Sequence, residues 1–380
     1  MDKKLKIAIV HDYLHEYGGA EGLVSAISEI YKAAPVYTAT YDKENMRKAG
    51  VFLSTEIIYP KWKTSIPDLV YKYLHKLFIA NLPFYFMRLN LSKYDLIISS
   101  TAHFAKGIKT TNKQLHICYI HTPPRFLYGL PGEIRKRSYW YWNLLLWPLD
   151  TFLRYMDKRF AKNPDFLLCN SKTVQDRIKK VYKRESVIIH PFPKVVFKKE
   201  YQTSGDYYLV ISRLVDFKNV DLCIKVCGKN NIKLKVAGIG TSEEYLRILA
   251  SKYESVEMLG FVNEEEKLKL IGGCKGMLCT VKHEDFGMVP LEAFVYGKPV
   301  IALKDSGYLE TVIDGKTGIF FSDLTQEALY KAIKKFENTK FNKEFIMKHA
   351  SHFSKERFKK EFKDFVDNKV NQKFGIDNTK

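Results

Sequence analysis

The sequence predicts an α/β protein with two doubly wound domains, each built on a parallel sheet with helices over both faces. Three observations lead to this fold class. A chain of 380 residues is long for one hydrophobic core and suits two. Short apolar runs of strand length alternate with helical patterns. This alternation stops at residues 190–205, a charged stretch with prolines, and then restarts, so we expect a hinge there.

The first predicted domain, residues 1–190, opens with an apolar strand at Leu5–Val10. Gly18 and Gly19 then break the chain, and Ala20–Tyr31 has the pattern of a helix. Further strands are expected at Leu96–Ser99, Ile117–Ile120 and Phe166–Cys169, with a helix from about Ser171. Because these runs are apolar except for Lys6 and Ser99, they are typical of parallel strands that are buried on both faces.

The second predicted domain, residues 206–352, repeats the alternation. Its expected strands are Tyr207–Ile211, Leu234–Ala237, Val256–Leu259 and Gly276–Thr280. Its expected helices are Val220–Cys227, Ser242–Tyr253 and Glu264–Ile271. Ligands of doubly wound folds bind at the carboxyl ends of the strands, so the loops after these strands are the candidate site. Phe353–Phe365 reads as a final amphipathic helix.

The segment "HEDFGMVPLEAFVYGKPVIA", which begins at His283, carries two glutamates around a short helix. We expect the helix at Leu291–Tyr296, with Pro290 in its first turn and Gly297 in the left-handed position after its end. Val300–Leu303 follows as a buried strand. This places Glu284 in the loop before the helix and Glu292 in its first turn.

The start of this helix combines two chemistries. The N–H groups of Gly287, Met288 and Val289 point out of a helix N-terminus, which attracts anions. The carboxylates of Glu284 and Glu292 accept hydrogen bonds from hydroxyl groups. The pattern therefore suits a ligand that carries both phosphates and hydroxyls. Spacing alone leaves open a simpler alternative, a loop with solvated glutamates.

Two cations and two glycines mark other strand ends in the second domain. Arg213 and Lys218, in "ISRLVDFKNV", could neutralise a diphosphate together, and surface ion pairs are the alternative. In "VAGIGTSE", Gly238 and Gly240 start a dinucleotide fingerprint, but Glu243 stands where its third glycine belongs. These glycines therefore predict either a close approach of backbone to a phosphate or base, or a tight turn.

Taken in order, these segments resemble the retaining glycosyltransferases of family 4. The resemblance covers nearly the whole chain and also includes "HEYGGAE", "IHTPPRFLYG", "GFVNEEE" and "SGYLETVIDGKTGIFF". It implies the GT-B fold, two facing Rossmann-like domains with the active site in the cleft, and a C-terminal helix at about 353–368 that packs back on the first domain. The "HTPPRFLYG" stretch looks most like a subgroup that builds bacterial surface polysaccharides such as lipopolysaccharide, many of them mannosyltransferases.

The resemblance also implies a role for individual residues. Arg213 and Lys218 would hold the donor diphosphate, Glu284 the sugar hydroxyls and Glu292 the nucleotide ribose. His121 would lie near the transferred sugar, although a histidine after a buried strand is otherwise often structural. The remaining donor-binding positions would be Gly18, Gly19, Gly238, Gly240, Phe261, Val262, Phe286, Gly287, Met288 and Val289.

The expected activity is transfer of a hexose, from GDP-mannose first and UDP-sugars second, to a lipid-linked or polysaccharide acceptor. Protein cations and the helix dipole would stabilise the leaving diphosphate, so no metal or other cofactor is expected. Three alternatives are a glycosidase with paired carboxylates, a GT-B sugar-nucleotide epimerase, and a basic nucleic-acid-binding protein. A glycosidase leaves Arg213 and Lys218 unexplained, and the chain has no recognisable nucleic-acid-binding module.

Composition predicts a cytoplasmic protein that docks on the inner face of the cytoplasmic membrane. The formal net charge is +20, and residues 1–190 hold 30 Lys and Arg against 16 Asp and Glu. The basic, aromatic segments 59–90 and 135–160 suit an anionic bilayer surface, with ordinary amphipathic helices as the alternative. We expect no signal peptide, no spanning segment of roughly 18 apolar residues, and reduced, buried cysteines, since no CxxC pair occurs.

Overall fold

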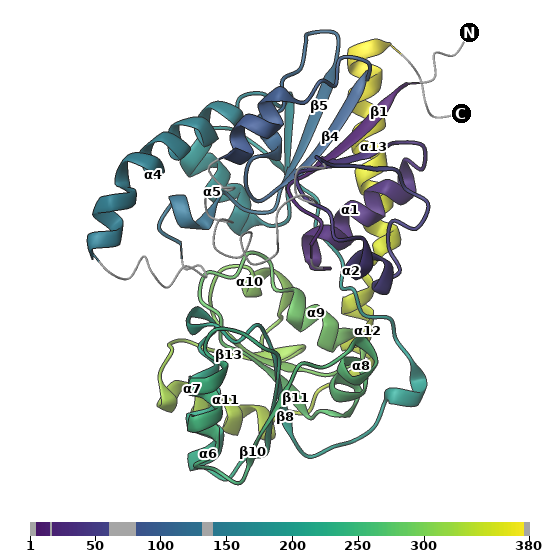
Figure 1. Cartoon of the computed structure of the whole chain (residues 1–380). Coiled ribbons are helices and arrows are strands. Elements are labelled where there is room, and N and C mark those ends of the chain that lie inside the picture. The colour runs from purple at the N-terminus through teal and green to yellow at the C-terminus, as the bar shows by residue number, and fades with distance from the viewer. Residues whose placement is uncertain (1–4, 16, 61–80, 131–139, 376–380) are drawn as a thin grey trace. The chain divides into compact units, whose positions relative to one another are not determined.

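The computed structural model describes residues 5–15, 17–60, 81–130 and 140–375. Its chain divides into two compact units (Figure 1). The first unit combines the described residues up to Pro191 with those from Lys355 onward, and the second unit is Phe192–Ser354. The second unit thus begins inside the predicted hinge. We describe each unit by itself.

The first unit is built on a parallel sheet of seven described strands in the order β3-β2-β1-β4-β5-β6-β7. The strands are β1 (Ile7–His11), β2 (Val36–Thr38), β3 (Ile57–Ile58), β4 (Leu96–Thr101), β5 (Leu115–Ile120), β6 (Phe166–Cys169) and β7 (Val187–Ile188). The order reverses between β1 and β4. This reversal is the topological switch point of a doubly wound sheet, beside which ligands bind in such folds.

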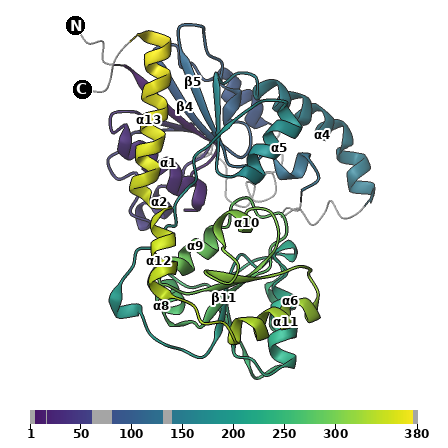
Figure 2. The same cartoon turned by 180° about the vertical axis from the view of Figure 1, so that it is seen from behind.

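Helices lie on both sides of the first sheet, with α1 and α13 on one side and α4 and α5 on the other (Figures 1 and 2). The helices are α1 (Gly19–Ile30), α2 (Lys43–Lys48), α4 (Trp140–Phe160), α5 (Lys172–Tyr182) and α13 (Lys355–Phe374). Ser171 caps α5, because its side chain accepts a hydrogen bond from the N–H of Val174. The cap thus lies two residues after the end of β6 and directly before the first residue of the helix.

Helix α13 belongs to the first unit, although the whole second unit precedes it in the chain. Its buried side chains recur every four residues, at Phe358, Phe362, Val366 and Val370. Lys355 and Lys359 both pair with Glu29 of α1, at 2.5 and 3.1 Å. The helix is longer than the expected Phe353–Phe365, because this apolar stripe continues for two more turns.

The second unit repeats the topology with a parallel sheet of six described strands, in the order β10-β9-β8-β11-β12-β13. The strands are β8 (Tyr208–Ile211), β9 (Leu234–Ala237), β10 (Val256–Gly260), β11 (Gly276–Cys279), β12 (Val300–Leu303) and β13 (Gly318–Phe321). Its switch point lies between β8 and β11. Both units are thus Rossmann-like and doubly wound, which confirms the predicted fold class of each.

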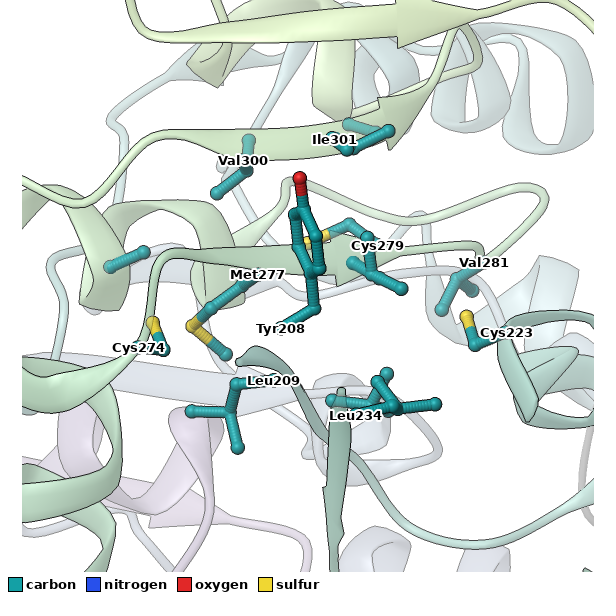
Figure 3. Packing of buried hydrophobic residues seen from close by; sticks show 14 of the residues in the cluster. Tyr208, Leu209, Cys223, Leu234, Cys274, Met277, Cys279, Val281, Val300 and Ile301 are labelled. Carbon is teal, nitrogen blue, oxygen red and sulfur yellow. The ribbon is translucent and has the colours of Figure 1, made fainter. Parts of the chain in front are cut away.

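Two groups of helices cover the second sheet: α6 (Val220–Lys229), α7 (Glu243–Ala250) and α11 (Gln326–Glu337) form one, and α8 (Glu264–Gly273), α9 (Met288–Val295) and α12 (Lys343–Ser351) the other. The short α10 (Tyr308–Thr311) contacts α9. Figure 3 shows the core, where Tyr208 packs among Met277, Cys279, Val300 and Ile301. All six cysteines of the chain are buried, and none forms a disulfide.

The predicted boundaries of α9 were wrong at its start. We expected the helix from Leu291, but it begins at Met288, directly after Gly287. Gly287 takes a left-handed φ of +95°, which sets the beginning of the helix. Glu292 consequently lies in the second turn and not the first. The strands β6, β9 and β12 match the prediction at both ends.

Candidate functional site

The switch point of the second unit brings together a cation and a carboxylate from distant parts of the sequence. Lys218 lies in the loop after β8, and Glu284 lies in the loop after β11. The Nζ atom of Lys218 is 3.5 Å from Oε2 of Glu284, and the side chains are 19% and 21% exposed. Both loops start at the carboxyl ends of neighbouring strands, where doubly wound folds bind ligands.

Backbone ties hold these two loops to one another. Asn219 has a left-handed φ of +53°, and its side-chain amide donates to the carbonyl of Thr280 at 2.9 Å. In return, the hydroxyl of Thr280 donates to the carbonyl of Lys218 at 2.8 Å. Because the backbone of each loop is bonded to the other, the approach of Lys218 to Glu284 does not depend on that ion pair alone.

Arg213 is exposed and lies in the loop after β8. This loop is held by the loop that follows the neighbouring strand β9. The N–H of Leu214 donates to the carbonyl of Ile239, in the loop after β9, at 2.9 Å. A Cβ atom on Gly238 would lie 1.9 Å from the carbonyl oxygen of Ser212, and one on Gly240 would lie 2.3 Å from that of Leu214. The two glycines therefore let these two loops pack together, which accounts for "VAGIG" without a dinucleotide.

The N-terminus of α9 has no side-chain cap and no acidic residue in its first turn. Its first N–H groups have no acceptor within the helix. Gly287 is required here, since its φ is +95° and a Cβ atom would lie 2.7 Å from Oγ1 of Thr311. Phe286, 2% exposed, anchors the preceding loop in the core. The N–H of Gly307 donates to the carbonyl of Glu284 at 3.1 Å and holds that loop from the other side.

Glu292 is nearly buried and has a partner that the sequence reasoning missed. Its Oε1 atom lies 3.0 Å from Nζ of Lys267 on α8, and the side chains are 8% and 12% exposed. Its Oε2 atom has no hydrogen-bond partner among the described residues and is not sealed from solvent. Phe261, 73% exposed, and Val262 follow β10 just before α8. The run "NEEEKLKL" gave no signal that distinguishes Lys267 from Lys269.

His121 follows β5 in the first unit, beside the switch point of that sheet. Its Nε2 atom is 2.8 Å from the hydroxyl of Ser100, which lies near the end of the neighbouring strand β4. The buried ring of His11 meets that of His121 edge-on, with centroids 6.3 Å apart. Burial lowers the pKa of His11, but the Glu21 and Asp12 carboxylates and the Ser100 carbonyl together raise this pKa above the ordinary value.

Gly18 and Gly19 lie at the start of α1, the helix that follows β1 in the chain: Gly18 is its N-cap and Gly19 its first residue. The N–H of Gly18 donates to Oε2 of Glu21 at 2.9 Å. A Cβ atom on Gly18 would lie 2.7 Å from the same oxygen, whereas one on Gly19 would meet nothing within 4 Å. Gly18 therefore serves the capping of α1, and the space at Gly19 is open.

Asp12, directly after β1, was not identified from the sequence. Its carboxylate is 2% exposed and binds the loop after β4. It accepts four backbone hydrogen bonds of 2.7 to 3.0 Å, from the N–H groups of Ala102, His103, Phe104 and Ala105. Burial opposes its ionisation, but the His103 and His11 rings and these N–H groups hold the pKa of Asp12 well below its usual range. A single aspartate after a strand carries no pattern that predicts this role.

The predicted residues thus fall into three groups. Lys218 and Glu284 meet, and the loops of Arg213, Gly238 and Gly240 pack beside them. Glu292 lies on α9 and faces Lys267. Gly18, Gly19 and His121 belong to the first unit. Among the described residues, no group of three or more His, Cys, Asp or Glu side chains is placed to hold a metal ion.

Comparisons with known proteins cover both units. The family model "Glycosyl transferases group 1" matches residues 191–357, and the model "Glycosyltransferase Family 4" matches residues 36–192. An uncharacterized glycosyltransferase of Methanocaldococcus jannaschii is 26% identical over 206 residues, which span 53% of this chain and 58% of that protein. The alpha-1,3/1,6-mannosyltransferase ALG2 of Candida glabrata is 26% identical over 374 residues, 82% of this chain and 78% of that protein.

Solved structures with the same architecture have low sequence identity. Anabaena HepE, in complex with UDP and glucose, superposes with a TM-score of 0.65 at 16% identity and covers 96% of this chain and 99% of its own. The lipopolysaccharide outer core galactosyltransferase WaaB gives 0.63 at 14% identity, with coverage of 96% and 100%. At these identities the likeness concerns the fold.

Proposed function

Because this chain belongs to the family 4 glycosyltransferases and has their GT-B fold, we propose that it moves a hexose from a nucleotide sugar to a glycan acceptor with retention. GDP-mannose is the proposed donor and a lipid-linked or polysaccharide saccharide the acceptor. The mannosyltransferase names of the ALG2 relatives support mannose. UDP-sugars are the second choice, since HepE is described in complex with UDP-glucose.

The observation that carries the proposal is the meeting of Lys218 and Glu284 at the switch point between β8 and β11. Without a donor, each of these charges is the partner of the other. With a donor bound, Lys218 would turn to a phosphate oxygen, and Glu284 would accept a hydrogen bond from a sugar hydroxyl. The donor thus replaces one charged contact with two, which favours its binding.

The proposed reaction breaks the bond between the anomeric carbon and the phosphate oxygen. Negative charge builds up on the leaving diphosphate, where Arg213, Lys218 and the N-terminus of α9 stabilise it more than in the ground state. The acceptor oxygen forms the new bond from the same face of the sugar, and its proton passes to the departing phosphate. Since protein cations supply the positive charge, we propose that transfer continues in the presence of a metal chelator.

Donor screening tests this function. Purified protein is incubated with GDP-mannose, UDP-glucose or UDP-galactose, with and without a lipid-linked saccharide, and the release of nucleoside diphosphate is followed. We expect release from one donor that depends on the acceptor, with the anomeric configuration read by NMR. An epimerase would instead change the sugar nucleotide without any acceptor. If no donor is turned over and calorimetry detects no nucleotide binding, the proposal is wrong.

The proposal includes docking on an anionic membrane, where a lipid-linked acceptor would be presented. Helix α4 buries Leu153, Met156 and Phe160 and exposes large apolar side chains elsewhere, such as Trp147, which is 62% exposed. The other exposed ones are Leu144, Leu149, Phe152 and Tyr155, with Phe84 stacked on Phe152. Lys158 and Arg159 in the last turn suit an anionic surface. No helix among the described residues is long and apolar enough to cross a bilayer.

Vesicle flotation tests the docking. The basic residues at 61–80 and 131–139, on which the sequence-based expectation partly depends, lie outside the described residues. Binding of the wild type to anionic vesicles should weaken as salt rises but persist, because salt screens charge and leaves apolar insertion. Trp147→Ser should remove much of the salt-resistant part, whereas Ile248→Ser, at an exposed position of the second unit, should not. A wild type that stays unbound at low salt would refute the docking.

A further inference from the structure

The ion pair between Lys267 and Glu292 suggests how the site reads the sugar of the nucleotide. We propose that Lys267 is a positioning residue that orients the Glu292 carboxylate toward a vicinal ribose diol and so makes the site selective for ribonucleotides over 2′-deoxyribonucleotides. This inference rests on the proposed function, in which Glu292 binds the donor ribose.

The backbone around Lys267 is fixed by a reciprocal cap at the start of α8. The side chain of Asn263 accepts from the N–H of Glu266 at 2.9 Å, and Glu266 accepts from the N–H of Asn263 at 2.8 Å. The next residue, Lys267, donates its N–H to the carbonyl of Asn263 at 2.9 Å. Lys267 therefore projects from the rigid first turn of α8, which packs against α9.

The charge environment makes Glu292 the main partner of Lys267. Glu264 is 3.9 Å from the ammonium but is 69% exposed, so water screens that contact. Glu292 is 3.0 Å away at a position where both groups are nearly buried. Removing the lysine would leave a poorly hydrated carboxylate without its counter-charge, and the carboxylate would turn toward whatever water it can reach.

The two oxygens of Glu292 have different surroundings, and this difference points to the ligand. Oε1 is held by the ammonium, whereas Oε2 has no partner among the described residues and retains access to solvent. A carboxylate accepts hydrogen bonds only, and a ribose 2′,3′-diol presents two adjacent donors. Fixing Oε1 fixes the plane of the carboxylate, so the remaining acceptor positions face a diol at a set angle. A 2′-deoxyribose offers one donor fewer to the same group.

The test is calorimetry with GDP, UDP and their 2′-deoxy counterparts on the full chain. The wild type should bind the ribonucleotide about tenfold more tightly than the deoxynucleotide, the effect of one hydrogen bond to a charged group. Lys267→Met should weaken ribonucleotide binding by about tenfold and leave deoxynucleotide binding nearly unchanged, so that the selectivity disappears. Lys267→Arg, which keeps the charge, should restore part of it.

A matched control comes from the same helix. Lys269 pairs with Glu265 at 2.7 Å, both well exposed, and Lys269→Met should leave both affinities unchanged. In the double variant Lys267→Met/Glu292→Gln, the loss should equal that of Glu292→Gln alone, because the lysine acts through the glutamate. Additive losses would overturn the inference. Thermal melts identify a variant that fails to fold, in which case Lys267→Gln takes its place.

The remaining outcomes separate the inference from the proposed function. If the wild type is selective and Glu292→Gln is not, but Lys267→Met keeps the selectivity, Lys267 has no positioning role and the proposed function stands. If the wild type binds nucleotides without selecting ribose, the diol assignment is wrong and the inference falls with it. If it binds no nucleotide at all, the proposed function itself fails.

Discussion

Replacing Asp157 by asparagine should destabilise the first unit strongly, because it leaves a buried lysine without its counter-charge. Lys106 and Asp157 are 1% and 0% exposed, with Nζ and Oδ1 2.5 Å apart. The other carboxylate oxygen accepts hydrogen bonds from the hydroxyls of Tyr128 at 2.7 Å and Tyr182 at 2.9 Å. Lys106 also donates to the carbonyl of His103. The network thus joins α4 and α5 to the loops after β4 and β5.

The expected magnitude follows from this burial. Removing one partner of a buried ion pair costs about 3–5 kcal/mol of stability. Asparagine at position 157 still has an oxygen that can accept the hydrogen bonds of the two tyrosines, so the substitution mainly removes the charge. For a unit of this size, each kcal/mol lowers Tm by about 2–4 °C, so we expect a decrease of about 6–20 °C. Lys106→Met combined with Asp157→Asn should recover most of the loss, since no unpaired charge then remains buried.

Tryptophan fluorescence during a urea titration measures this effect in the first unit alone. All four tryptophans of the chain precede residue 148, and Phe192–Ser354 contains none. The control is Asp176→Asn on α5, which breaks an exposed pair with Lys172 at 2.9 Å and should cost less than about 1 kcal/mol. If Asp157→Asn changes the free energy of unfolding no more than this control, the buried pair does not have the importance assigned to it.

Three further predictions concern the site and the pH response. Lys218→Ala should lower turnover, with a loss of about 2–4 kcal/mol of transition-state stabilisation, and should leave Tm unchanged. Near-normal transfer rates would contradict the role of Lys218. Glu284→Gln should reduce kcat more than the affinity for free nucleoside diphosphate, and calorimetry showing the reverse would refute the sugar contact. Burial and the Arg184 charge lower the pKa of His116 to about 3. Below about pH 6.5 the His116 side chain therefore takes up a proton in the unfolded chain but not in the folded one. The free energy of unfolding then falls by up to about 1.4 kcal/mol for each unit by which the pH is lowered. His116→Gln should remove that part of the slope between pH 6 and 5, and identical slopes in urea titrations would disprove it.

The sequence by itself determined the class of fold and most of its elements. The runs Phe166–Cys169 and Val300–Leu303 are continuously apolar, and Leu234–Ala237 is apolar except for Lys235. All three end at polar or turn residues, so their strands could be placed at both ends. Local rules also applied at Gly297, which takes the expected left-handed φ of +67° after α9. Such features depend on neighbours in the chain, and these are visible in the sequence.

The order of the motifs in the sequence identified the candidate site residues, but their arrangement in space depended on the strand order of the second sheet. Lys218 and Glu284 are 66 positions apart, and only the adjacency of β8 and β11 brings their side chains together. For the glycines of "VAGIG", the sequence identified the positions but not the reason for them. Their local pattern allowed a ligand or a turn, and the structure gave a third reason, the backbone of the loop after β8.

Tertiary structure alone decided the buried charge pairs. Asp12, Lys106, Asp157 and Lys267 look like any surface charge in the sequence, because an isolated charged residue carries no sign of its burial. Their burial is tolerable only because partners arrive from other elements: loop amides for Asp12, α4 for Lys106 and α9 for Lys267. Those partners are fixed by which strands lie side by side and which helices cover them, and this information exists only once the chain has folded.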